Sequence, residues 1–166
     1  ASNLGLSYTL STRDSVDMRT VLLPSELQTS ASTYPNNLSL QFGHTLFPSK
    51  VRPGKGIGLY GKVAGTSGNP NPISWSFVGG ISGEGMFANR PYDSFGIGAY
   101  YYNWSKALED TIDPLLPLDN EKGLEIYYSF AITPWFILTA DLQVIDPGKA
   151  NFATETVAAL RGKITF

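Results

Sequence analysis

Apolar and polar residues alternate along three segments near the end of the sequence, over residues 124–132, 136–144 and 155–166. Successive side chains of a β-strand point to opposite faces, so each segment predicts a strand with one apolar face and one polar face. In the last segment, Leu160 and Ile164 share the apolar face. A strand of a soluble sheet usually has about 5–6 residues, whereas a tilted strand that crosses a bilayer needs about 9–11, and these segments suit the second case.

The same alternation predicts earlier strands at residues 4–10, 38–46, 57–63, 75–81 and 95–101. Residues 16–23 predict a weaker strand, because their apolar residues do not alternate cleanly. Loops are expected at residues 24–37, 65–72, 83–93 and 105–122, the last with one helical turn at 106–110. The result is about eight or nine antiparallel strands in one domain that spans residues 1–166.

Composition favours strands and turns over helices. The chain contains 17 Gly, 11 Pro, 9 Tyr and 9 Phe, and its net charge of −2 gives no strong attraction to nucleic acid. It has no cysteine, so neither a disulfide nor a thiolate metal site can form. No run of about 18 apolar residues occurs, which excludes a transmembrane helix but not a transmembrane barrel. The first residues lack the pattern of a signal peptide, so we expect that one was removed or that the chain begins inside a longer protein.

These features predict an all-β fold, an antiparallel transmembrane β-barrel. Its tight link at residues 133–134 is expected to face the periplasm, and its longer loops at 105–122 and 145–153 the outside. Residues near predicted strand ends would form an interfacial aromatic girdle. They are Trp75, Trp104, Trp135 and Phe166.

The strand count leaves two interpretations of the barrel open. Nine antiparallel strands cannot close a bacterial barrel, which has an even number. Either the strand at 16–23 is miscounted and eight strands close a small barrel, or the chain forms the C-terminal part of a larger barrel. We favour the larger barrel. A soluble β-sandwich also alternates and is the alternative fold.

Six motifs stand in consistent order between about Leu38 and Phe166. They are residues 53–60 (PGKGIGLY), 68–73 (GNPNPI), 90–98 (RPYDSFGIG), 125–128 (EIYY), 133–135 (TPW) and 141–148 (DLQVIDPG). Together they resemble the carbohydrate-selective (OprB-like) porins of Gram-negative outer membranes. The resemblance implies a barrel of about sixteen strands, of which this chain covers roughly the C-terminal half. It also implies a passive diffusion channel for sugars without a cofactor, but it carries over no pore-constriction residue.

If the apolar face meets lipid, the opposite face of each strand lines the lumen. A sugar-selective pore needs hydrogen-bonding groups for the hydroxyls and aromatic faces for the C–H surface of the sugar ring. The alternative is that the charged residues only pair across strands and solvate the wall. Parity predicts the following lumen-lining, substrate-contacting residues: Lys62, Tyr100, Tyr102, Glu125, Tyr127, Asp141, Gln143, Arg161 and Lys163.

Three other features resemble chemical motifs, but their context does not support the corresponding sites. Residues 56–61 match GxGxxG, but the alternation continues through them, whereas a dinucleotide site needs a helix to follow. His44 is the single histidine, shares the apolar face and has no companions for catalysis or metal binding. Acidic residues crowd positions 110–121, but their spacing fits no calcium loop. We therefore predict no metal, no cofactor and no enzyme.

The favoured hypothesis is an outer-membrane porin, a passive diffusion channel for carbohydrates. Its expected partners are carbohydrate solutes, outer-membrane lipid and lipopolysaccharide, with a homo-oligomer left open and no nucleic acid. A small closed barrel with a structural or adhesive role is one alternative, and it would show no conductance. A soluble all-β binding module is the other, and it would stay monodisperse without detergent.

Overall fold

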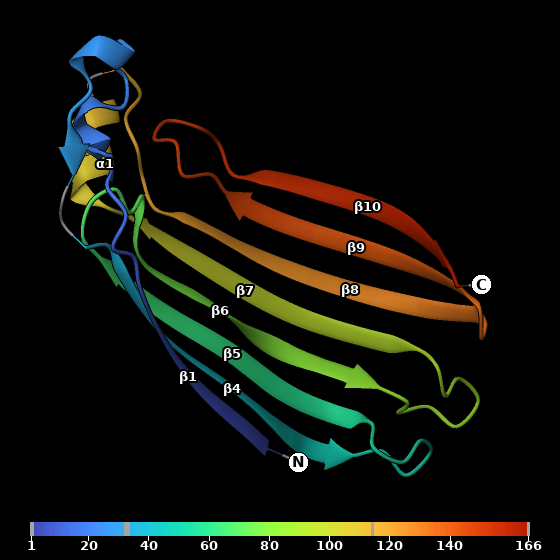
Figure 1. Ribbon diagram of the computed structural model, residues 1–166. Helices are drawn as coiled ribbons and strands as arrows, with labels where there is room; N and C mark the ends of the chain where they lie inside the picture. The colour runs from blue at the N-terminus through green and yellow to red at the C-terminus, as the bar shows by residue number, and fades with distance from the viewer. Residues whose placement is uncertain (1, 32–33, 114, 166) are drawn as a thin grey trace.

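The chain folds into one antiparallel sheet of eight long strands, in a computed structural model that describes residues 2–31, 34–113 and 115–165 (Figure 1). Each strand pairs with the next one along the sheet, and β1 and β10 form its two free edges. The sheet is therefore open. Its strands are β1 (Ser2–Leu10), β4 (Asn36–Pro48), β5 (Gly56–Ser67), β6 (Ile73–Glu84), β7 (Ser94–Trp104), β8 (Glu121–Thr133), β9 (Phe136–Asp146) and β10 (Glu155–Ile164).

The predicted strand at 16–23 is wrong. β2 (Ser15–Val16) instead pairs with β3 (Ser30–Ala31) as a separate short ribbon, and η1 (Met18–Thr20) and η2 (Ser25–Leu27) are single 3₁₀ turns. Val21, Leu22 and Leu23 are consecutive, and no strand can place all three on one face. The prediction of a ninth strand fails for this reason, and the eight remaining strands do not close a small barrel.

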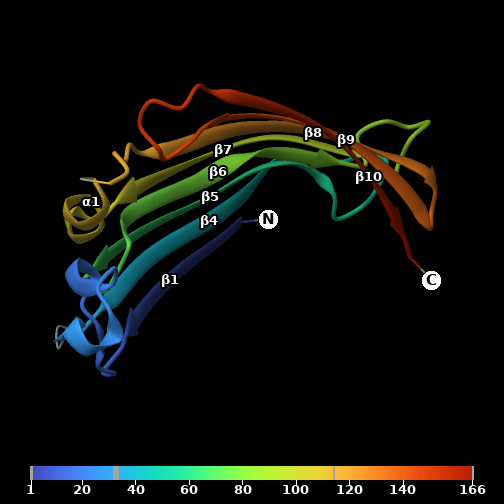
Figure 2. The same ribbon diagram turned by 90° about the horizontal axis from the view of Figure 1, so that it is seen from above.

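The connections divide between two ends of the sheet. The helix end carries residues 11–35, 68–72, 105–120 and 147–154, and the turn end carries 49–55, 85–93 and 134–135. Figure 2 shows α1 (Lys106–Ile112) and the first of these connections gathered beyond one end of the strands. The predicted helical turn at 106–110 is thus confirmed and extended. No helix among the described residues is long and apolar enough to cross a membrane.

Local hydrogen bonds explain how the helix end is organised. The Ser105 hydroxyl accepts a hydrogen bond from the Leu108 N–H at 3.3 Å and caps α1, which packs against η1. Asp17 caps η1 by accepting from the Arg19 N–H at 2.8 Å, and it also accepts from the Asn69 side chain at 2.6 Å. These bonds attach the connection after β1 to the loop between β5 and β6. The connection after β1, the β5–β6 loop and the connection that contains α1 therefore lie together at the helix end.

The two faces of the sheet differ as the alternation predicts. Leu142 pairs with Ile126 and Ala158 on one face, while Gln143 pairs with Glu125 on the other. On the apolar face Leu160, Ile164 and Leu142 are 70%, 54% and 44% exposed, so no second layer covers them. Among the described residues, Ala31 and Ala64 are the only buried hydrophobic residues. The sheet has no core of its own, which rules out the soluble sandwich for this part of the chain.

Trp75 and Trp135 lie at opposite ends of the strands, as an interfacial girdle requires. Trp75 stands near the start of β6 and stacks on Tyr101 at 4.8 Å between ring centroids, and Trp135 lies in the turn between β8 and β9. Both indoles are about half exposed. Trp104 ends β7 and donates its Nε1–H to the Asp119 carbonyl at 2.6 Å. The fourth predicted residue, Phe166, lies outside the described residues.

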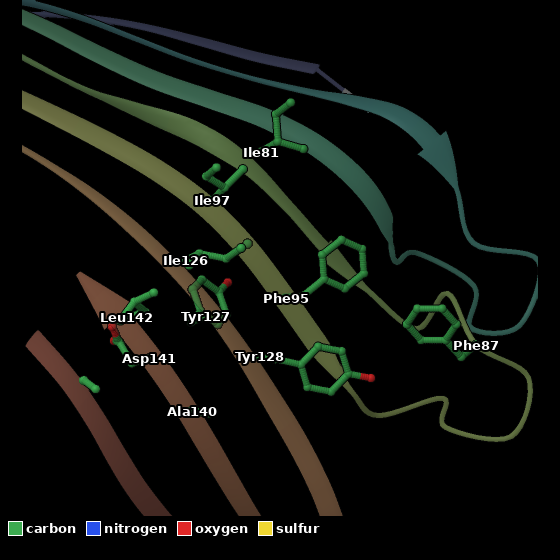
Figure 3. A pocket seen from close by; sticks show the side chains of 12 residues that line it. Ile81, Phe87, Phe95, Ile97, Ile126, Tyr127, Tyr128, Ala140, Asp141 and Leu142 are labelled. Atoms are coloured by element: carbon green, nitrogen blue, oxygen red, sulfur yellow. The ribbon is translucent and has the colours of Figure 1, made fainter. Parts of the chain in front are cut away.

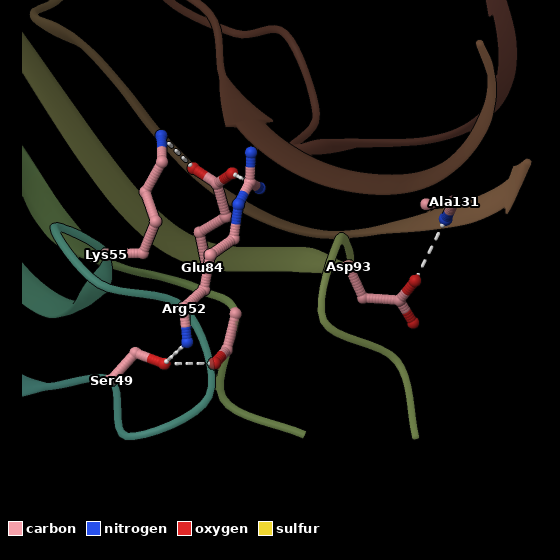
Figure 4. Close-up of polar contacts among 7 residues, drawn as sticks. Ser49, Arg52, Lys55, Glu84, Asp93 and Ala131 are labelled. Atoms are coloured by element: carbon pink, nitrogen blue, oxygen red, sulfur yellow. Dashed lines mark hydrogen bonds and ion pairs between the residues drawn. The ribbon is translucent and has the colours of Figure 1, made fainter. Parts of the chain in front are cut away.

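Paired charges hold the turn end together (Figure 4). Glu84, the last residue of β6, forms ion pairs with Arg52 and, at 2.7 Å, with the Lys55 Nζ. The Ser49 hydroxyl donates to the Gly85 carbonyl, and the Arg52 guanidinium lies 4.8 Å from the centre of the Tyr92 ring. The turns before β5 and after β6 are therefore joined across the sheet.

Asp93 fastens the second of these turns to the end of β8. Its carboxylate is 2% exposed and accepts hydrogen bonds from the Arg90 guanidinium, from the Tyr128 hydroxyl at 2.7 Å and from the Ala131 N–H at 2.9 Å. Burial alone would raise the pKa of Asp93, but the bonds from Arg90, Tyr128 and Ala131 outweigh it and hold the pKa below its ordinary value. The charged form is thus the one that the fold stabilises.

Leu142→Arg and Gln143→Arg test the assignment of the two faces. In the full-length protein, Leu142→Arg should impair membrane folding by about 2–4 kcal/mol near mid-depth, because it places a charge in hydrocarbon. Gln143→Arg should fold like the parent, because the adjacent residue faces the other side. Folding into lipid vesicles, followed by the shift of the folded band on unheated gels, compares them. Equal defects in both variants would disprove the two-sided assignment.

Asp93→Asn tests the clamp at the turn end. Because the pKa of Asp93 is lowered in the fold, its contribution is complete above the ordinary value of about 3.9 and is lost as the pH falls through the lower folded value. We expect Asp93→Asn to lower the unfolding free energy at pH 7 by about 2–3 kcal/mol, with the difference from the parent shrinking towards about pH 2. Urea titrations in detergent measure this difference. Asp110→Asn, on the exposed side of α1, is the control and should change little; a difference independent of pH would contradict the role of the Asp93 charge.

Candidate functional site

All nine residues predicted to line a lumen lie on the polar face of the sheet. Register shows this directly, because residues paired across neighbouring strands share a face. Tyr127 pairs with Asp141, and Glu125 pairs with both Gly98 and Gln143. The other members occupy the same parity along β5, β7 and β10: Lys62, Tyr100, Tyr102, Arg161 and Lys163.

The strands bring three of these residues and Tyr60 around one part of the wall. A hollow of about 110 Å³ is lined by Tyr60, Tyr100, Glu125 and Gln143, with Gly98 in its floor. Tyr127 and Asp141 occupy the next row of the same face. Tyr60 was missed as a site residue, although it shares parity with Lys62 two positions along β5. The hollow combines aromatic rings with a carboxylate and an amide, which can accept and donate hydrogen bonds.

The remaining predicted residues lie in separate places. Lys62 lies beside Gln41 and Asn3 in a hollow of about 470 Å³ towards the β1 edge. Arg161 and Lys163 lie with Ser129 in another of about 640 Å³ towards the β10 edge. The Tyr102 ring lies 5.1 Å from that of Tyr100, nearer the helix end. The polar face is thus a wall with several hollows that combine polar and apolar side chains, not one enclosed pocket.

Charges on this wall are not neutralised by ion pairs. Among the described residues, none of the salt bridges includes Lys62, Arg161, Lys163, Glu125 or Asp141. Gln143 donates to one Asp141 carboxylate oxygen at 3.5 Å, the other oxygen is buried, and the carboxylate also interacts with Glu125 of the neighbouring strand. Glu125 nevertheless interacts across strands with the Asp141 carboxylate and with the Arg161 charge. These five charged residues therefore form no ion pair within the described part of the chain, although some of them interact across strands.

A further hollow, of about 650 Å³, lies on the apolar face (Figure 3). Ile81, Ile97, Phe95, Ile126 and Leu142 line it from neighbouring strands. Its lining is almost entirely apolar: the Tyr128 hydroxyl is bound to Asp93, and alternation turns Asp141 and Tyr127 towards the other face. Its chemistry suits hydrocarbon and does not suit a hydroxylated solute.

The features set aside in the sequence lie where no site is formed. The GxGxxG run begins β5 and lies within the strand, with no helix after it. His44 belongs to the apolar face, opposite Leu59, and its Nδ1 shares a hydrogen bond of 2.7 Å with the Ser2 hydroxyl. Within the described residues, no group of three or more His, Cys, Asp or Glu side chains could hold a metal ion.

An open wall of long antiparallel strands, apolar on one face and polar on the other, defines the class of transmembrane β-barrel proteins. The family model of the carbohydrate-selective porins, OprB family, matches residues 1–166, and the chain belongs to this family. The solved high-pH structure of OprB from Pseudomonas putida is similar with a TM-score of 0.84 at 19% identity. The match covers 99% of this chain and 44% of that chain, so the chain spans less than half of its length. No curated protein sequence matches significantly.

The two acidic residues near the hollow generate a prediction about ion selectivity. Glu125→Gln combined with Asp141→Asn removes negative charge from the wall while keeping the size of each side chain. In planar bilayers under a KCl gradient, the reversal potential of the full-length channel should shift towards anion preference, because fixed charges in a pore set the local ion concentrations. The control is Glu109→Gln in α1, which should leave the reversal potential unchanged. An unchanged potential in the double variant would place both carboxylates away from the ion path.

Proposed function

We propose that this chain forms part of the wall of an outer-membrane porin through which carbohydrates diffuse passively. The observation that carries the proposal is the absence of a core: across the described residues, the apolar side chains of a long-stranded sheet are uncovered, while the opposite face carries hydroxyl, amide and charged groups. Hydrocarbon against the apolar face and water against the polar face would satisfy both sets of side chains. Membership of the carbohydrate-selective porin family supports sugars as the solutes.

Closure of the barrel follows from the edges of the sheet. β1 and β10 each pair on one side only, and an unpaired strand edge in hydrocarbon costs several kcal/mol for each unsatisfied backbone group. We infer that further strands complete the ring, with this chain as the C-terminal half of a barrel of about sixteen strands. The share of the Pseudomonas putida OprB chain that is covered, 44%, supports this arrangement.

The orientation in the membrane is inferred from the loops. The two-residue link at 134–135 lies at the turn end, whereas the long connections 11–35 and 105–120 lie at the helix end. Bacterial barrels have short periplasmic turns and long outer loops, so the helix end faces outwards. Outer-membrane lipid and lipopolysaccharide are then the neighbours of the apolar face. No covalent chemistry is proposed, since passage needs only binding groups along the wall.

Solute flux tests the proposed function. Vesicles that contain the full-length protein should swell in glucose, and more slowly in a trisaccharide, because a water-filled pore selects by size and by the groups that line it. Heat-denatured protein serves as the control for vesicle leakage. A closed structural barrel would give neither swelling nor conductance. The absence of both would reject the porin hypothesis.

A further inference from the structure

The hollow on the apolar face lies across two neighbouring rows of paired residues. One row contains Leu142 and Ala158, and the next row, nearer the turn end, contains Phe95, Tyr128 and Ala140. Ala140 lies opposite Tyr128 and Ala158 lies opposite Leu142, so two short side chains leave a depression beside larger ones. Its volume of about 650 Å³ falls within the range of about 300–1,000 Å³ that is typical of small-molecule pockets.

Aromatic side chains border the hollow towards the turn end. The Phe87 and Phe95 rings lie 6.1 Å apart between centroids, and the Tyr128 ring lies 6.5 Å from Phe95 and 4.4 Å from Phe130. Figure 3 shows Phe95 and Tyr128 between the isoleucines and the connection that carries Phe87. The hollow therefore leads from aliphatic side chains in the strands to aromatic ones near the end of the sheet, where the interface of a membrane favours aromatic rings.

Arg90 places a cation beside this aromatic end. Its backbone N–H donates to the Phe87 carbonyl at 3.0 Å, and its guanidinium lies 5.5 Å from the centre of the Phe130 ring. Asp93 accepts from the Arg90 Nε–H and, at 3.2 Å, from an Nη2–H, whereas a guanidinium has five N–H groups. The Arg90 side chain is 45% exposed, so part of the guanidinium stays open to a second anion.

The distribution of charge favours an anionic lipid at this end of the sheet. The turn-end connections contain more basic than acidic residues: Lys50, Arg52, Lys55 and Arg90 against Asp93, with Glu84 at the end of β6. The helix-end connections contain more acidic than basic residues. Basic residues near a membrane surface attract anionic headgroups. In the proposed orientation the turn end meets the phospholipid leaflet, and lipopolysaccharide meets the acidic helix end.

We propose that an anionic glycerophospholipid of the periplasmic leaflet binds at this place, with one acyl chain in the hollow and its phosphate on Arg90. The inference rests on the proposed porin function and its orientation, and adds a lipid site that the passage of sugars does not require. Hydrogen bonds from a guanidinium to a phosphate are charge-assisted and about twice as strong as neutral ones. Because a hollow and a cation act together, the site selects a lipid by its headgroup as well as by its chains.

The test measures the lipids that stay bound to the full-length protein in detergent, by native mass spectrometry. The probes are phosphatidylglycerol, diacylglycerol with the same chains, and glycerol 3-phosphate. We expect phosphatidylglycerol to bind about fivefold more tightly than diacylglycerol, and glycerol 3-phosphate to show no retention because it has no chains. Arg90→Gln should abolish the preference for phosphatidylglycerol. Asp93→Asn should keep it, since this variant weakens the same turn but leaves the guanidinium in place.

A second pair of variants tests the hollow itself. Ala140→Phe fills the hollow and should weaken the binding of phosphatidylglycerol and of diacylglycerol alike. The matched control is Val144→Phe, which adds the same ring to the same face, two residues beyond Leu142 towards the helix end, and should leave lipid binding unchanged. Both variants should keep the glucose-driven swelling of vesicles, because neither residue faces the lumen.

Equal binding of phosphatidylglycerol and diacylglycerol by the parent, or equal losses of preference in Arg90→Gln and Asp93→Asn, would overturn the lipid site. A parent dimer that Ala140→Phe separates, with no phosphatidylglycerol bound, would also overturn it and make the hollow an interface between two copies. Normal glucose swelling in these cases leaves the porin function standing, whereas absent swelling and conductance reject that function separately. If Arg90→Gln fails to fold, the diacylglycerol comparison and the two phenylalanine variants still decide.

Discussion

Hydrocarbon offers no hydrogen-bond partner to a backbone N–H or C=O group, and this constraint explains most of the structure. Every strand must satisfy its backbone through neighbouring strands, which the order from β1 through β10 does for all except the two edges. The side chains must then suit two solvents at once. Strict alternation provides this, because one residue in two faces lipid and the next faces water. The lack of a packed core is the consequence of the same constraint.

Aromatic side chains compensate for a second weakness that alternation does not address, the glycines within the strands. Glycine weakens a strand, since it has no side chain to pack and loses much conformational freedom on folding. On the apolar face Phe42 covers Gly61, and on the polar face Tyr127 covers Gly96. The covering residue follows the solvent: phenylalanine where the ring meets lipid, tyrosine where its hydroxyl meets water. The same contact between an aromatic ring and a strand glycine thus occurs on both faces.

The sequence predicts the two-sided character of the strands because a strand has a period of two that needs no knowledge of its neighbours. The face of Leu142 and the face of Gln143 follow from parity alone, and both are confirmed. The strand count failed at Val21 to Leu23, where apolar residues that lie in an end loop resemble a strand. The glycine–tyrosine contacts could not be predicted, because they depend on which residues lie opposite one another across strands. Tyr127 and Gly96 are distant in sequence, and only the register brings them together.

The distribution of ion pairs separates what holds the wall together from what it offers to solutes. Glu84 with Arg52 and Lys55, Asp93 with Arg90, and Lys122 with Asp146 all lie in loops or at strand ends. On the polar face, Lys62 in β5 and Arg161 and Lys163 in the edge strand β10 have no such partner within the described residues. An unpaired charge in a packed, dry interior would cost several kcal/mol, whereas one in a water-filled space keeps its hydration. Charged groups along this face are thus compatible with the proposed water-filled lumen, which would keep them hydrated.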